Sequence, residues 1–199
     1  ALMGALADCE QIANSLLGQP ANALSTLSFL VAGIVVARRR DLTWVGVALV
    51  ATGIGSFLFH GPMAPEGQWL HDTTLVWLIA VIAGWNRPWK RWTRVPGLVL
   101  LGVVFAGAPL VADPLAIALT ATTLGLILIP DRSLHDLGPI VLLGMAAVVG
   151  RLGATGGPLC DPDSLLQPHA LWHMAAAAAV AWWALGRELP DTSDGLVLS

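Results

Sequence analysis

The chain has 199 residues, of which 56% are hydrophobic and only 12% are charged, and its formal net charge is −3. A soluble domain carries about twice that fraction of charged residues, so the composition argues against a soluble protein. The small negative charge provides no basic surface for nucleic acid, and no nucleic-acid partner is expected.

Apolar segments separated by charged residues, proline or glycine run along the whole chain and predict an integral membrane protein. Each segment should be a helix, because an open sheet edge leaves backbone groups without partners in lipid. We therefore predict one all-α domain over residues 1–199, a bundle of seven transmembrane helices. The expected spans are 22–37, 43–59, 68–85, 95–111, 114–129, 137–152 and 167–185.

The basic residues predict how this bundle lies in the membrane. Nine of the ten Lys and Arg residues follow the first, third, fifth and seventh spans, and only Arg151 lies on the other side. Cytoplasmic loops are enriched in basic residues. We therefore expect the N-terminal segment 1–21 outside the cytoplasm and the short tail 190–199 inside it.

His169 and His173 lie four residues apart at the start of the last expected helix, so they share one helix face. Two imidazoles placed in this way can bind one metal ion. Ionisable groups within lipid are costly and tend to be functional. The alternative is a pair of histidines at the hydrated end of a membrane helix, and a metal site needs at least a third ligand.

The expected topology brings His60, Asp72, His169 and His173 into one outer layer of the membrane. The second span runs outward and ends near His60, whereas the third runs inward with Asp72 about one turn from its start. Ser56 lies one turn deeper than His60 on the same helix face. Three neutral histidines are a common zinc shell with a fourth position left for water. We therefore predict that His60, His169 and His173 bind zinc.

The neighbouring polar residues each have two interpretations. Zinc lowers the pKa of a bound water and polarises a carbonyl, and Asp72 would then pass a proton to a leaving amine. Alternatively, Asp72 is a carboxylate favoured by a helix N-terminus, and Ser56 bonds back to its own helix. His71 points about 100° away from Asp72 on the helix, so we leave it outside the predicted site. His135 is expected in a solvated cytoplasmic loop.

The order of these residues resembles a superfamily that contains the alkaline ceramidases, the adiponectin and progestin receptors, and related membrane hydrolases. The match is closest to the ceramidase branch and covers nearly the whole chain. The stretches that carry it are Asp8-Cys9-Glu10, Asn22-x2-Ser25, Ser56-x3-His60, Asp72 and Pro168-His169-Ala170-Leu171-Trp172-His173.

The resemblance implies a zinc-dependent hydrolase whose site faces the extracytoplasmic side. Zinc would be bound by the three histidines, Asp72 would position and deprotonate water, and Ser56 would assist the metal or the oxyanion. The implied substrate is a membrane N-acyl lipid, with ceramide the leading candidate. Cleavage of its amide would yield a free fatty acid and a sphingoid base. No oligomeric state is predicted.

Two further features follow from the ceramidase resemblance. Family ceramidases bind calcium through an acidic cluster near the first helix, which Asp8 and Glu10 match in part. Gln19 stands where another carboxylate is expected, and this weighs against a calcium site. The family also has a disulfide at places similar to Cys9 and Cys160, which the expected topology puts outside the cytoplasm, where oxidation is permitted. Two free thiols are the alternative.

Other classes of membrane protein fit the sequence less fully than a zinc hydrolase does. A receptor-like lipid-binding protein of the adiponectin and progestin type would use the same metal core structurally. A haem protein also needs intramembrane histidines, but it does not need Asp72 beside them. A Ser–His protease built on Ser56 leaves the histidine pair unexplained. A retinal protein is excluded, because the only lysine, Lys90, lies in an expected loop.

Overall fold

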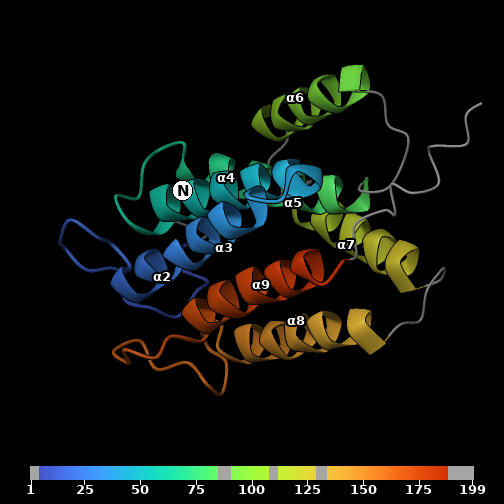
Figure 1. The fold of residues 1–199 in the computed structure, drawn as a ribbon. Helices are drawn as coiled ribbons and strands as arrows, with labels where there is room; N and C mark the ends of the chain where they lie inside the picture. The colour runs from blue at the N-terminus through green and yellow to red at the C-terminus, as the bar shows by residue number, and fades with distance from the viewer. Residues whose placement is uncertain (1–4, 85–90, 108–111, 129–133, 188–199) are drawn as a thin grey trace, which may run out of the picture.

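The computed structural model describes residues 5–84, 91–107, 112–128 and 134–187, and it contains helices but no strand among them. Figure 1 shows the helices arranged as a bundle. They are α2 (Pro20–Ser25), α3 (Leu27–Ala37), the short 3-10 helix η1 (Arg40–Leu42), α4 (Thr43–His60), α5 (Gly67–Ala83), α6 (Arg91–Gly107), α7 (Ala112–Leu128), α8 (Leu134–Leu152) and α9 (Pro168–Leu185).

The seven expected helical segments each coincide with a helix of the structure, and α2 and α3 together form the first. The largest displacement is in the fourth, which was expected at 95–111 and is found at Arg91–Gly107. Two stretches, Pro20–Ala37 and Arg40–His60, are long and apolar enough to cross a membrane by length and composition. Their mean hydropathies are 1.7 and 1.9.

The centre of the bundle is formed by α3, α4, α5 and α9. Helix α4 packs against α3 and α5, and α9 lies beside both α3 and α8 (Figure 1). Burial of large apolar side chains stabilises this arrangement. The buried cluster at its core includes Phe29, Leu49, Leu78, Ala177 and Trp183.

A close approach of α4 and α5 brings the end of one helix against the start of the other. A Cβ atom at Gly55 would lie 2.7 Å from Thr74 Oγ1 and 2.8 Å from the carbonyl oxygen of Leu70. Across the same contact, Thr52 donates to the carbonyl oxygen of Thr74 at 3.1 Å. Glycine at position 55 therefore lets the two backbones meet, which places His60 close to the first turns of α5.

The basic residue Arg39 marks the opposite end of the bundle from His60. Its guanidinium donates to the carbonyl oxygens of Leu185 at 3.3 Å and Arg187 at 2.6 Å, and it pairs with Asp41 at 2.8 Å. The ends of α3 and α9 therefore lie together, and their starts lie together at the other end (Figure 1). Arginine at this position satisfies carbonyl groups that the end of α9 leaves without helical partners.

Candidate metal centre

Three histidines from two helices lie together at the end of the bundle where α4 stops and α9 begins. The ring centroids of His60 are 5.0 Å from His169 and 5.2 Å from His173, and the latter two are 4.5 Å apart. Imidazoles on one tetrahedral zinc, with bonds of about 2.0–2.1 Å, would have centroids about 5 Å apart. The spacing of the three predicted ligands therefore fits one metal ion.

Hydrogen bonds hold two of these rings in the orientation that a metal requires. His60 Nδ1 lies 2.7 Å from Gln19 Oε1, and the Gln19 amide nitrogen donates to the carbonyl oxygens of Ala5 and Glu10. Because those contacts fix which end of the Gln19 amide is oxygen, His60 must carry its proton on Nδ1. The lone pair of His60 is then on Nε2.

The same reasoning applies to His173. Its Nδ1 lies 2.8 Å from Ser25 Oγ, while the Ser25 hydroxyl donates to the carbonyl oxygen of Asn22 at 2.7 Å. The Ser25 oxygen therefore accepts from Nδ1–H and leaves Nε2 unprotonated. His169 Nδ1 lies 3.3 Å from Asp8 Oδ1, a third oxygen partner on the side away from Nε2. Metal-binding histidines usually have such an oxygen partner on the second nitrogen.

The Nε2 atoms of His60, His169 and His173 are all buried and have no hydrogen-bond partner in the described part of the chain. Leaving a buried polar atom unsatisfied costs about 1–3 kcal/mol, so three such atoms in one cluster call for an explanation. A metal ion coordinated by these nitrogens satisfies all three. The residues present therefore fit a bound metal, and two groups that contain His60, one with His173 and one with His169, have ligand atoms close enough to hold one.

Asp8 is the carboxylate nearest to the predicted ligands. Besides its contact with His169, its Oδ2 lies 3.9 Å from His60 Nδ1. Burial raises the pKa of the Asp8 carboxyl to about 7, with His71 opposing the increase and Glu10 adding to it. A cation bound near Asp8 would favour the ionised form of the Asp8 carboxyl. The carboxylate would in turn attract the protons on the Nδ1 atoms of His60 and His169.

The ring nitrogens and carboxylate oxygens that could bind a metal form two overlapping groups, and both groups contain His60. One group contains Asp8, His60 and His169, and the other contains His60, His71 and His173, with the atoms of each group within 4.8 Å of one another. Asp72 belongs to neither group. Its Oδ1 instead lies 2.9 Å from His71 Nδ1, so this carboxylate contacts the cluster through His71.

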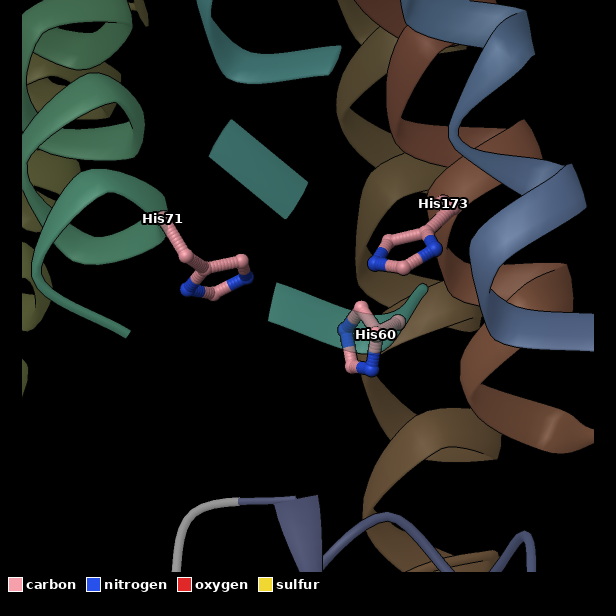
Figure 2. A group of neighbouring side chains, drawn as sticks. All are labelled: His60, His71 and His173. Carbon is pink, nitrogen blue, oxygen red and sulfur yellow. The ribbon is translucent and has the colours of Figure 1, made fainter. Parts of the chain in front are cut away.

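The prediction that His71 lies outside the site is wrong. Figure 2 shows its ring directed from α5 toward His60 and His173, and its centroid is 5.9 Å from that of His60. A rotation of 100° between adjacent helix positions describes the Cα–Cβ bonds, whereas the side-chain torsions decide where an imidazole ends. Because α4 and α5 pack closely, the start of α5 lies near enough to His60 for the His71 side chain to reach the cluster.

Ser56 lies on α4 one turn before His60, as its spacing predicted, and its side chain is buried.

Glu10 accepts hydrogen bonds from the backbone N–H groups of Ala21 at 2.6 Å and Asn22 at 2.8 Å. It therefore caps the N-terminus of α2, while Asp8 faces the histidines. The two acidic residues considered for calcium thus contact separate partners.

A disulfide and a threonine hold the N-terminal segment over the histidines. Cys9 and Cys160 are joined, with their Cα atoms 5.5 Å apart. Beside them, the backbone N–H of Cys9 donates to Thr155 Oγ1 at 3.0 Å, and the N–H of Thr155 donates to the carbonyl oxygen of Ala7 at 3.0 Å. These bonds fix the backbone on both sides of Asp8.

An apolar cavity of about 510 Å³ lies within the bundle, with no histidine among the residues that line it. Phe29 lines this cavity, and its ring packs edge-on against His173 with a centroid distance of 5.9 Å. Small-molecule sites typically have volumes of about 300–1,000 Å³. The other lining residues come mainly from α5, α7, α8 and α9 and include Leu78, Ile82, Thr120, Leu143, Trp172, Ala176 and Ala179.

Comparison with models of protein families found no match, and neither did a comparison with curated proteins.

Proposed function

We propose that this protein is a seven-span membrane enzyme that uses zinc to hydrolyse the amide bond of an N-acyl lipid, with ceramide the leading candidate. The observation that carries the proposal is the set of three buried Nε2 atoms without partners, each on a ring whose Nδ1 faces an oxygen. Three neutral nitrogens with a fourth position open is the donor set of many catalytic zinc sites.

Three imidazole ligands with a fourth position open form a shell that is typical of catalytic zinc, and zinc is therefore the proposed ion. When bound, zinc supplies a Lewis acid and brings the pKa of a coordinated water toward neutrality. The protein's own contribution is orientation. Gln19, Ser25 and Asp8 hold the three rings, and a ring that is already oriented loses less entropy when it binds a metal.

Asp72 is the proposed carrier of the proton in this reaction. Water adds its oxygen to the amide carbonyl carbon, and Asp72 accepts the proton that the water loses. The carbon–nitrogen bond then breaks, and the same proton is delivered to the departing nitrogen. The products are a fatty acid and an amine, which for ceramide is a sphingoid base. Ser56, buried one turn below His60, is the proposed donor to the developing oxyanion.

The cavity supports a lipid as the substrate. Its lining is almost entirely apolar, and one of the lining residues, Phe29, also touches His173. An acyl chain that lay there with its carbonyl end toward Phe29 would bring its carbonyl carbon to the side of the cavity near the histidines. Nine of the ten basic residues follow odd-numbered spans, and this distribution supports the proposal that the site lies near the extracytoplasmic surface.

The second candidate is a receptor-like protein that binds lipid in the same cavity and uses the metal only to hold helices together. Liquid chromatography and mass spectrometry on a panel of ceramides and other N-acyl lipids separates the two. Purified zinc-loaded protein should release fatty acid from at least one of them, and protein stripped by a chelator should not. Zinc-loaded protein that binds these lipids but never releases fatty acid would support the receptor instead.

A further inference from the structure

Three histidine ligands would leave one position open on a tetrahedral metal, and a fourth imidazole, that of His71, lies beside two of them. The ring nitrogens of His71, His60 and His173 that are available to a metal lie within 4.8 Å of one another. Figure 2 shows the three rings, from α5, α4 and α9, turned toward one shared space. His71 therefore reaches the cluster from α5, a third helix besides α4 and α9.

The Nδ1 atom of His71 faces an oxygen, as do those of the other three histidines. Its Nδ1 lies 2.9 Å from Asp72 Oδ1, and an ionised carboxylate can only accept, so Nδ1 carries the proton and Nε2 has the lone pair. A carboxylate behind a histidine raises its basicity as a ligand and fixes its ring. All four histidines thus have an oxygen partner at Nδ1.

His71 differs from the other three histidines in its Nε2 atom, which is not among the buried and unpartnered ring nitrogens of the cluster. Its side chain keeps 19% of its surface exposed, close to the 21% of His169, whereas that of His60 is fully buried. Its ring packs at 5.2 Å from Phe59, at the edge of the cluster. Rotation of the His71 side chain away from the cluster would leave the three buried Nε2 atoms in place.

We propose that His71 is an exchangeable fourth ligand that closes the metal site in the absence of substrate. In this state it fills the coordination position that water and a substrate carbonyl need, and it also engages the carboxylate of Asp72. Its departure would open the metal and release Asp72 in one movement. This inference rests on the proposed metal centre, but it does not depend on the hydrolytic reaction.

Zinc affinity provides the first test. The full chain in detergent is titrated with zinc against a competing chelator, for wild type, His71→Gln and Trp69→Phe. Trp69 is the matched control, because it lies on α5 two residues away and donates to the carbonyl oxygen of Gly102 on α6 instead of facing the cluster. We expect His71→Gln to weaken zinc binding by about tenfold or more, in the range of losses seen around zinc sites. Trp69→Phe should leave it unchanged.

A double-mutant cycle then asks whether Asp72 acts through His71. Asp72→Asn should weaken zinc binding by about 10–100-fold in the wild-type background. In the His71→Gln background it should cause no further loss, because the ring that it orients is gone. Equal effects of Asp72→Asn in both backgrounds would contradict the proposed coupling.

X-ray absorption at the zinc edge provides the second test, since imidazole rings are counted from their outer-shell scattering. Wild type should show four imidazoles and His71→Gln three. His71→Glu should also show three, but it should bind zinc more tightly than His71→Gln, because a carboxylate of similar reach can replace the lost ligand. This second variant keeps the test valid if His71→Gln fails to fold.

The result that overturns the inference is unchanged zinc affinity and an unchanged imidazole count when His71 is replaced. None of these measurements uses turnover. A protein whose zinc affinity depends on His71 but which cleaves no lipid would refute the proposed hydrolase and leave the fourth ligand standing. A protein that cleaves lipid with zinc affinity independent of His71 would do the reverse.

Discussion

Ser25 Oγ lies 2.8 Å from Nδ1 of His173, and the hydrogen of the same hydroxyl is committed to the carbonyl oxygen of Asn22. This pair of bonds decides which nitrogen of His173 carries the proton. It also links α2 to α9 through one of the proposed metal ligands. A serine 148 residues away in sequence thereby prepares one ligand.

Replacing Ser25 with alanine should therefore weaken zinc binding while leaving the helices intact. The expected loss is about tenfold, at the lower end of the range for a partner behind a ligand. Ser28→Ala is the matched control, because the Ser28 hydroxyl only donates to the carbonyl oxygen of Ser25. Chelator competition measures both variants, and equal zinc affinity for the two would remove Ser25 from the metal centre.

The disulfide between Cys9 and Cys160 should stabilise both the fold and the site. It closes a separation of 151 residues in sequence, and losing such a link typically costs about 2–5 kcal/mol of unfolding free energy. The double variant Cys9→Ser, Cys160→Ser should also bind zinc more weakly, because Asp8 is no longer held beside His169. Thermal unfolding and zinc titration measure the two effects.

Intact-mass analysis after alkylation without reductant tests the disulfide itself. The native protein should gain no label, and it should gain two after reduction. Two labelled thiols before reduction would mean that the cysteines are free.

The apolar cavity should set the length of the acyl chain that the protein accepts. Ala176 lines the cavity, so Ala176→Phe should shift fatty acid release toward shorter chains. Ala178 lies on the outer face of the same helix, in a groove between α8 and α9, and Ala178→Phe should not change the preference. Mass spectrometry of products from an acyl-length series compares the two, and the same chain-length profile for both would exclude this cavity.

The distribution of basic residues leads to a prediction about the two sides of the membrane. A reporter fused at the C-terminus should read cytoplasmic, because nine of the ten Lys and Arg residues are expected on that side. A reporter fused at the N-terminus should read extracytoplasmic. The opposite readout at either end would place the histidine cluster on the cytoplasmic side of the membrane. The proposed site could then not take its lipid from the outer leaflet.

The parts of the site that the sequence predicts are those with a regular spacing. His169 and His173 share a face because four residues make about one helical turn. The position of His60 follows from the end of an apolar span, and the structure places all three rings together. These inferences need only helix periodicity and the order of the spans.

The parts that sequence reasoning missed depend on contacts between distant segments. Asp8 reaches His169 because the disulfide and Thr155 fix an irregular segment, and no periodicity describes such a segment. His71 reaches the cluster through its side-chain torsions and the close packing of two helices. The sequence shows Gln19 only as a departure from an expected carboxylate, and its role as the partner of His60 depends on a burial that the structure shows.

The central claim is that zinc and Asp72 together hydrolyse a lipid amide, and the paired measurement of zinc content and fatty acid release tests it most directly. At saturating zinc, wild type and Asp72→Asn should both carry one zinc per chain, since none of the three buried ligands is changed. Wild type should release fatty acid from ceramide or another N-acyl lipid, and Asp72→Asn should lose at least about a hundredfold in rate, as expected for removal of a general base. Equal release from the two proteins, or a zinc-loaded wild type that releases none from any lipid, would contradict the account.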